Sequence, residues 1–492
     1  MDIRVFVVLA IASAAFSLLT RGDRRVSLAI ALIGLVGSIG AAYLIGESTS
    51  AELLDARLVA TPFLRWFLVI GSVGALLACL LALATRWQPD LPAATLAALG
   101  GCALALSIDA MPIALLAATA AGALGLISLA TPHAEVGATR LMLGYLQGLS
   151  VAGAVAIVAA AWLVGANGPV VFEAATGGSA ALAMALALAI RLGAVPFHRP
   201  AARIVGAAVP LGIPLLLAWL PVLMFLVALT WSHRVLLAQP VDIGAVRVLL
   251  VLAGAGTLLV GAIAAVLRPA ETDDVQHVIS YGIVQDAGFF LLAFGAFDAA
   301  VWREARVWSL YFVASKLGLA AWLAAILAVR GDAAIPSLEG WARRSPLLAI
   351  ALVGAVVAGL GLPGFDSFDA RLAIIQSATD RVLRWVAYGG WLLAYVPFVR
   401  ILWIGLRTPG ESLPLPARFR LRVPRERPDW RDARATVRYV ADAAVLSRLT
   451  IATILTVMLG LGAAFLALGH ASLSEAAAIL PEPIVPGPTP GR

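Results

Sequence analysis

Apolar runs of about twenty residues, the length that a helix needs to cross a bilayer, recur along the whole of this chain. Hydrophobic residues make up 62% of its 492 residues and charged residues only 13%, and a soluble domain cannot bury that much apolar surface. The sequence therefore predicts an all-α membrane protein of about 14 transmembrane helices, with nothing left over for a soluble catalytic domain. The predicted spans are 3–20, 27–46, 64–85, 93–108, 110–130, 138–165, 177–195, 206–231, 246–267, 275–298, 307–329, 345–363, 367–404 (a broken helix and a full one) and 449–469.

The spans and the loops between them divide the chain into five segments. Helices 1–3 occupy residues 1–92, helices 4–8 occupy 93–232, helices 9–13 occupy 246–404, a basic loop occupies 405–448, and the last helix with its tail occupies 449–492. The first apolar run has its only A-x-A pattern, Ala12 to Ala14, inside the run, so we expect a retained helix and not a removed signal peptide.

The net charge of +7 does not indicate a nucleic-acid partner, because the arginines gather in alternate loops, with exceptions such as Arg57 and Arg234. Loops enriched in arginine face the cytoplasm, which predicts both termini outside. For the basic loop we expect a positive-inside anchor that touches anionic lipid, with a docking surface for a partner as the alternative. High alanine and arginine content suggests a bacterial plasma membrane. The arginine-rich loops carry Arg21, Arg24, Arg25, Arg86, Arg140, Arg199, Arg203, Arg268, Arg330, Arg343 and Arg344.

Lys316 is the only lysine among 35 lysines and arginines, and it lies near the middle of its predicted span. A charge at mid-bilayer costs about 2.5–3.5 kcal/mol, so it needs a reason to persist. Arginine keeps its proton in proteins, whereas the pKa of a buried lysine shifts readily. A lone lysine at this depth indicates a proton relay, and the alternative is a structural ion pair or a snorkelling amine.

Two carboxylates also lie in or beside predicted spans, where a charge is costly. Asp286 lies about twelve residues into its span, and Asp109 lies at the start of the fifth. A carboxylate inside the membrane is either protonated or paired, so each is a candidate for a relay or for a structural pair. Cys79 and Cys102 lack metal-site or disulfide spacing, and we expect neither a metal nor a redox cofactor in this chain.

Two arginines lie beside predicted helix breaks. Arg191 precedes Pro196, and Arg371 follows Pro363. Broken helices in the two halves of a chain indicate a transport site in inverted-repeat transporters. Asp109 and Arg191 are 82 residues apart and Asp286 and Arg371 are 85 apart, which predicts two inverted five-helix repeats. His198, at the first break, is a candidate for passing a proton or for capping freed carbonyls.

Several stretches resemble the antiporter-like subunits of respiratory complex I, of the N or M type. Residues 191–198 (RLGAVPFH), followed by residues 206–210 (GAAVP), resemble the family's "K…PFH…GAP.P" segment. Residues 274–288 resemble its "DLKRLLAYSSI…AG", residues 346–371 its "P…GIPP…GF.GK", and residues 109–113 the "EL.S" of its fifth helix. The resemblance covers about residues 93–380, in the family's order.

The resemblance implies a subunit that moves protons while partner subunits, which hold flavin, iron–sulfur and quinone sites, carry out the redox chemistry. It implies that Asp109 takes the place of the fifth-helix glutamate, Arg191 that of its lysine partner, Lys316 that of the central lysine, and Arg371 that of the exit-side lysine beside Asp369. The chain is a divergent member, because both flanking lysines are arginine and Gln276-His277 replaces a Lys-Arg pair.

Three functions follow as hypotheses. The first is a proton-translocating, non-redox membrane subunit of a complex I-like NADH:quinone oxidoreductase, assembled with other membrane subunits in the lipid bilayer. The second is a subunit of a related membrane-bound hydrogenase or of a cation/proton antiporter. The third is a structural subunit that has lost pumping and whose charges are locked in ion pairs.

Overall fold

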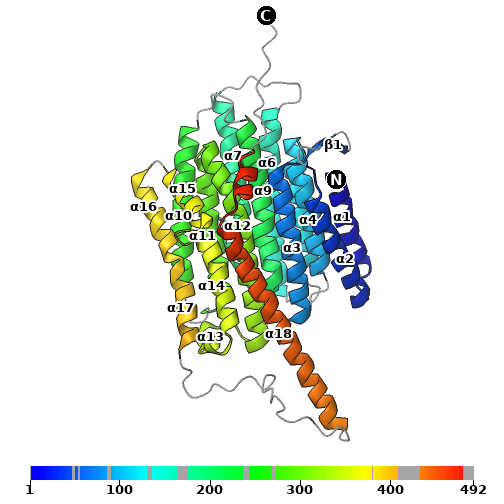
Figure 1. Ribbon diagram of the computed structural model, residues 1–492. Coiled ribbons are helices and arrows are strands. Elements are labelled where there is room, and N and C mark those ends of the chain that lie inside the picture. The colour runs from blue at the N-terminus through cyan, green and yellow to red at the C-terminus, as the bar shows by residue number, and fades with distance from the viewer. Residues whose placement is uncertain are drawn as a thin grey trace, which may run out of the picture.

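The computed structural model describes residues 2–46, 50–53, 56–85, 90–129, 136–164, 174–235, 243–267, 273–378, 380–407 and 433–479. These residues form an upright bundle of helices (Figure 1). Within the described ranges, nine helices are long and apolar enough to cross a membrane, and a bent pair, residues 335–344 with 346–360, passes the same test with a bend of 112°. The chain is therefore a multi-pass helical membrane protein, as predicted.

The described helices follow one another in order along the chain. The first half comprises α1 (Ile3–Leu19), α2 (Arg24–Tyr43), α3 (Pro62–Ala84), α4 (Leu91–Ser107), α5 (Met111–Leu129), α6 (Val136–Val164), α7 (Ala174–Leu192), α8 (His198–Ala207) and α9 (Leu220–Val235). The second half comprises α10 (Gly244–Val266), α11 (Val275–Gly295), α12 (Ala299–Arg330), η4 (Ile335–Leu338), α13 (Trp341–Arg344), α14 (Pro346–Leu360), α15 (Asp366–Gln376), α16 (Arg381–Leu393), α17 (Tyr395–Leu406), α18 (Ala433–Ala467) and α19 (Ala471–Ala478).

A two-stranded antiparallel hairpin, β1 (Ser50–Leu53) with β2 (Ala56–Val59), connects α2 to α3. The expectation of helices alone is therefore wrong at this point. Beyond this pairing of strands, Arg57 accepts a hydrogen bond from the Asp109 amide at 2.9 Å, and Leu58 forms a bridge with Ile108. The hairpin thus pairs with backbone groups of the turn between α4 and α5 and fixes that turn. The apolar pattern of the sequence does not predict this contact.

Three predicted spans differ clearly in their bounds, and the last of them begins at Ala433, inside the predicted basic loop. The eighth span begins with a 3₁₀ turn (η1, Pro210–Gly212) and a π-helical turn (η2, Leu215–Trp219) before α9, because prolines 210, 214 and 221 offer no amide to a regular α-helix. The eleventh span begins at Ala299, eight residues before the predicted start, and carries Arg306 inside the bundle.

Close contacts through glycine hold α11 at the centre of the second half. A Cβ added at Gly288 would approach the Gly254 carbonyl oxygen to 2.5 Å, and one at Gly261 would approach the Gln285 backbone to 2.6 Å. Small residues let membrane helices approach in this way. From Ile283 to Gly295, every residue of α11 is buried, so the polar residues in that segment face other helices and not lipid.

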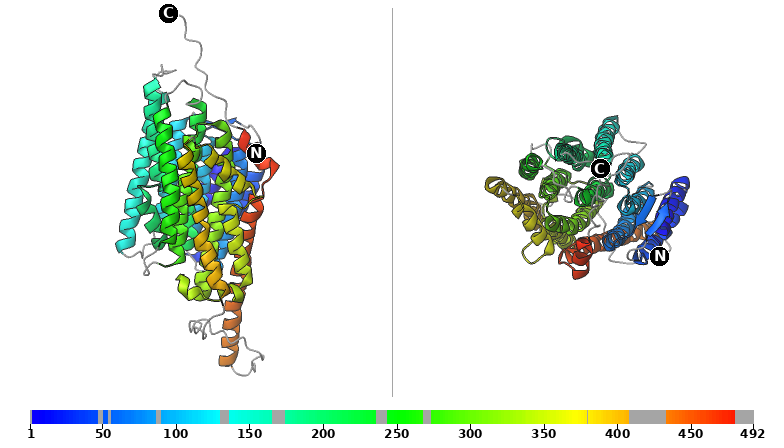
Figure 2. Two further views of the ribbon diagram at one scale, coloured as in Figure 1. Left: turned by 90° about the vertical axis from the view of Figure 1, so that its left-hand side faces the viewer. Right: turned by 90° about the horizontal axis from the view of Figure 1, so that it is seen from above.

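Both described ends of the chain lie at one end of the bundle, and α13 and the start of α18 lie at the other (Figure 1). The view turned by 90° keeps this arrangement (Figure 2). Arg343 and Arg344 belong to α13, and Arg330 ends α12 nearby in the chain. We call this end of the molecule the arginine face. Most of the predicted basic loop lies outside the described residues, and its last part, from Ala433, is the beginning of α18.

Candidate functional site

Asp286, Lys316 and Arg371 meet in the interior of the second half, and we call them the charge triad. The Lys316 Nζ lies 2.5 Å from Asp286 Oδ2, and the Arg371 Nη2 lies 2.5 Å from Asp286 Oδ1. The Lys316 side chain is 4% exposed, and those of Asp286 and Arg371 are 0% exposed. The triad lies near mid-membrane, because Asp286 is about 17 Å along α11 at 1.5 Å per residue.

Aromatic rings surround the two cations of the triad. The Arg371 guanidinium lies 4.3 Å from the centre of the Phe289 ring and 5.1 Å from that of Trp308, and the Lys316 ammonium lies 5.4 Å from that of Phe312. Ring faces attract cations where water is excluded. The Nε and Nη1 atoms of Arg371 have no hydrogen-bond partner among the described residues, so the guanidinium is held by one carboxylate oxygen and two rings.

A helix break places Arg371 in the triad. α14 ends at Leu360, the chain passes Pro363, and α15 begins at Asp366. Gly361 makes this turn with a φ of +79°, a conformation that favours glycine. The Leu360 carbonyl, freed by the break, accepts hydrogen bonds from the Trp391 indole at 2.7 Å and the Tyr395 hydroxyl at 3.2 Å. Protein groups thus satisfy the backbone where lipid cannot.

The triad carries two cations for one carboxylate. With Lys316 protonated its net charge is +1, and with Lys316 neutral it is zero. Arg371 remains charged in both states, because a guanidinium keeps its proton. Among the three, Lys316 is therefore the group suited to hold and release a proton, while Arg371 keeps Asp286 paired in either state.

The structure does not bring Asp109 and Arg191 together, although the resemblance to the family implies that they are partners. Asp109 is exposed and its carboxylate is paired with Arg234 at the end of α9. It is held there because the hairpin and the α4–α5 turn lie at one end of the bundle. The residue of α5 that faces Arg191 is Gly122, where an added Cβ would lie 3.0 Å from Nη2.

Arg191 is a buried cation at the end of α7. Its side chain is 3% exposed, and Nη1 donates to the Tyr145 hydroxyl of α6 at 2.7 Å. That hydroxyl donates to the Leu216 carbonyl in the π-helical turn at 3.1 Å. No carboxylate contacts Arg191 among the described residues. The first half therefore holds a fixed positive charge, and sequence reasoning missed Tyr145 because nothing local sets it apart.

The first helix break separates α7 from α8 and contains Pro196. The Val195 amide donates to Thr257 Oγ1 of α10 at 3.2 Å, a contact that links the two halves. His198 begins α8 and is partly exposed. Its ring lies 6.2 Å from that of Tyr281, and its Nδ1 atom has no partner within the described part of the chain.

Asp369 lies apart from the triad and is exposed on α15. Its neighbour Asp366 approaches the buried Tyr311 hydroxyl at 3.5 Å. Tyr311 precedes Lys316 by five residues on α12, about 7.5 Å along the helix axis. Tyr311 and Asp366 thus connect the triad's helix to the exposed part of α15. The sequence contains a signal for Tyr311, since it is a polar aromatic residue next to Lys316.

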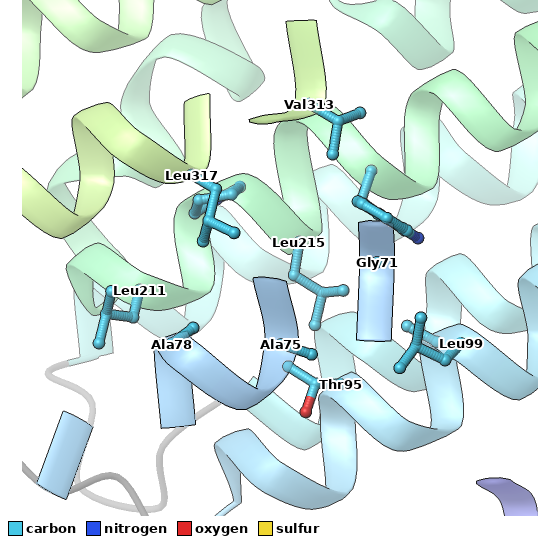
Figure 3. A pocket seen from close by; sticks show the side chains of 12 residues that line it. Gly71, Ala75, Ala78, Thr95, Leu99, Leu211, Leu215, Val313 and Leu317 are labelled. Carbon is cyan, nitrogen blue, oxygen red and sulfur yellow. The ribbon is translucent and has the colours of Figure 1, made fainter. Parts of the chain in front are cut away.

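An apolar pocket lies between α3, α4, α12 and the turns η1 and η2 of the eighth span, and it does not include the triad. Figure 3 shows Val313 and Leu317 of α12 directed into it beside Gly71 and Leu99. Its lining holds no ionisable residue, and its two polar side chains are engaged: Thr95 with the Pro92 carbonyl and Trp219 with Cys102. This pocket offers nothing to bind a polar solute.

Fold and site together define a multi-pass helical membrane protein that keeps one lysine in an ion-paired cluster at mid-membrane. The chain belongs to the NADH:quinone oxidoreductase/Mrp antiporter transmembrane family, whose model matches residues 133–395, more than half of the chain. This match confirms the resemblance drawn from the sequence.

Known relatives are similar over part or all of the chain. NADH-quinone oxidoreductase subunit N of Heliobacterium modesticaldum is 26% identical over 173 residues, which are 34% of this chain and only 36% of that protein. A chain of the membrane-bound sulfane sulfur reductase, an archaeal respiratory membrane complex, superposes with a TM-score of 0.73 at 15% identity over 97% of both chains. A chain of the Mrp complex from Dietzia sp. DQ12-45-1b gives 0.66 at 20% identity, over 96% of this chain and 97% of that one. At these identities the two structures establish the fold.

Proposed function

We propose that this chain is a proton-translocating, non-redox membrane subunit of a complex I-like oxidoreductase that passes electrons from NADH or a related donor to quinone. The observation that supports it best is the charge triad: the only lysine of the chain is paired at mid-membrane with Asp286 and Arg371, beside a helix break. A charge at that depth is costly and marks ion pathways in membrane proteins.

In this proposal Lys316 alternates between ammonium and amine. Arg371 stays paired with Asp286 in both states. In the first half, the buried Arg191 contributes a fixed positive charge. Asp109 is paired with Arg234 at one end of the bundle. A proton released from Lys316 leaves past Tyr311 and Asp366, with Asp369 at the exposed rim. His198 at the first break belongs to the entry side.

We further propose that the chain has 14 transmembrane spans with two inverted five-helix repeats, residues 93–232 and 246–404. The nine long helices and the bent pair are supplemented, within the described ranges, by four shorter apolar helices, which is consistent with that number. The breaks after α7 and after α14 occupy corresponding places in the two proposed repeats.

The proposed setting is a bacterial plasma membrane with both termini outside. Partner subunits would include other membrane chains of the complex, and flavin, iron–sulfur and quinone sites would belong to partners. The alternative is a subunit of a membrane-bound hydrogenase or of a cation/proton antiporter, and the family's inclusion of Mrp antiporters supports the antiporter. Purification in mild detergent and mass spectrometry discriminates them: flavin or iron–sulfur subunits support the redox complex, and their absence supports an antiporter.

Lys316→Arg and Lys316→Met test the proton role. Arginine keeps the positive charge but cannot release the proton, so in reconstituted vesicles both variants should lose proton uptake while quinone reduction by the complex continues. Gln285→Leu is the matched control, because it removes a buried polar group next to Asp286 without changing charge. If Lys316→Arg pumps like the wild type, the lysine is a fixed charge and the proposal is wrong. If both variants fail to assemble, the triad is structural.

A further inference from the structure

The burial of α11 changes at Ile283. The residues beyond this point are buried without exception, whereas His277, Tyr281 and Gly282 in its first half are partly exposed. Positions 277 and 281 are four residues apart and share one face of the helix. An exposed strip therefore runs along α11 from its first turn at the arginine face to a point about one turn from Asp286.

Gly282 forms the inner end of this strip and faces Lys316. A Cβ added at Gly282 would have one heavy atom within 4 Å, the Lys316 Nζ at 4.0 Å. Gly288 on the same helix is different, because a Cβ there would collide with the backbone of α10 at 2.5 Å. Close packing thus explains Gly288 but not Gly282, whose missing side chain leaves space beside the ammonium.

Two histidines and a tyrosine line the strip. The His277 and Tyr281 rings lie 4.7 Å apart, and His198 lies opposite, 6.2 Å from Tyr281. The His277 Nε2 is 3.0 Å from the Ala264 carbonyl oxygen, and its amide donates to Asp274 at 2.6 Å. These contacts fix the imidazole at the mouth of the strip, on the level where α11 begins.

We propose that this strip is the route by which Lys316 takes up protons from water at the arginine face. A hydronium ion at the mouth gives up one proton and becomes water, the proton passes along the strip from one water molecule to the next, and the neutral Lys316 amine accepts it and becomes ammonium. His277 and Tyr281 are positioning residues for this transfer, and Gly282 keeps the last step open. The proposal rests on the proposed function and adds the entry side and its residues.

Cysteine accessibility tests the route in the assembled complex. Gly282→Cys and Tyr281→Cys, each in a Cys79→Ala, Cys102→Ala background, are exposed to a membrane-impermeant methanethiosulfonate added to either face of oriented vesicles. We expect both to react from the arginine face at least tenfold faster than Val278→Cys, whose position is fully buried. Equal rates, or reaction from the opposite face alone, would overturn the route.

One substitution at Gly282 and one at Gly256 test the use of the route. Gly282→Leu should fill the space beside Lys316 and slow proton uptake severalfold with the complex intact. Gly256→Leu on α10 is the matched control and should pump normally, because a Cβ added there meets no heavy atom within 4 Å. Normal pumping by Gly282→Leu would overturn the route. The two proposals can fail separately. If Gly282→Cys is not labelled and Lys316→Arg does not pump, the route is wrong and the proposed function stands. If Lys316→Arg pumps normally, the proposed function is wrong, whatever the labelling shows.

Discussion

The three members of the charge triad differ in what their loss would leave behind. Without Lys316, Asp286 and Arg371 remain as a neutral pair. Without Asp286, two cations share a site with 4% and 0% exposure and no counter-charge. Breaking a buried pair by removing one partner costs more than the pair itself contributes, because the remaining charge is uncompensated. The carboxylate is therefore the member on which stability depends most, because loss of either cation leaves a neutral pair.

Asp286→Asn should accordingly destabilise the chain more than Lys316→Met. We expect the free energy of unfolding to fall by about 3–5 kcal/mol for Asp286→Asn and by clearly less for Lys316→Met. Thermal unfolding in detergent gives the order. Adding Lys316→Met to Asp286→Asn should restore part of the loss, because one of the two uncompensated cations is gone. A double variant less stable than Asp286→Asn alone would contradict this account of the triad.

At the scale of helices, the two breaks show how polar backbone is kept inside the bundle. At the second break the aromatic donors Trp391 and Tyr395 cover the Leu360 carbonyl. At the first, one hydroxyl, Thr257 Oγ1, accepts from the Val195 amide. A buried donor that loses its acceptor costs about 1–3 kcal/mol. The hydrogen bond of the Val195 amide therefore depends on Thr257, a side chain from the other half.

Thr257→Val removes that hydroxyl with little change in shape. It should lower the free energy of unfolding by about 1–3 kcal/mol, read as a lower midpoint of thermal unfolding in detergent. Thr119→Val is the matched control, since among the described residues the Thr119 hydroxyl donates to the Leu115 carbonyl of its own helix and its loss leaves the helix ladder intact. Equal midpoints for the two variants would mean that the Val195 amide finds another acceptor.

Spans are predictable from the sequence because each depends on the hydropathy of one segment, and most helices agree with the predicted spans within a few residues. The cost of burying charge also singles out Asp286, Lys316 and Arg371 from the sequence alone. Which charged side chains form ion pairs is not predictable in the same way. The similar spacings suggest two equivalent pairs, yet Asp286 meets Arg371 while Asp109 meets Arg234. Contacts depend on the rotation and depth of each helix in the bundle, which the sequence of one helix does not encode.

At the scale of the molecule, the two halves carry unequal chemistry. The first half has a buried arginine bound to a tyrosine hydroxyl, and the second has a lysine beside a shared carboxylate. Because a guanidinium keeps its proton, the proposed proton exchange at mid-membrane falls to the second half. The proposed entry strip opens at the arginine face, so the direction of the proposed transport follows from which way that face points.

Matched arginine substitutions on the two faces determine that orientation. Arg303 lies near the start of α12 and Arg343 lies in α13 beyond its far end, and both are exposed. Loops rich in arginine stay in the cytoplasm. In intact cells an impermeant thiol reagent should therefore label Arg303→Cys and spare Arg343→Cys, and permeabilisation should expose the second. The reverse pattern would place the strip on α11 outside, so that Lys316 would load from the outer aqueous phase and the exit at Tyr311 and Asp366 would face the cytoplasm.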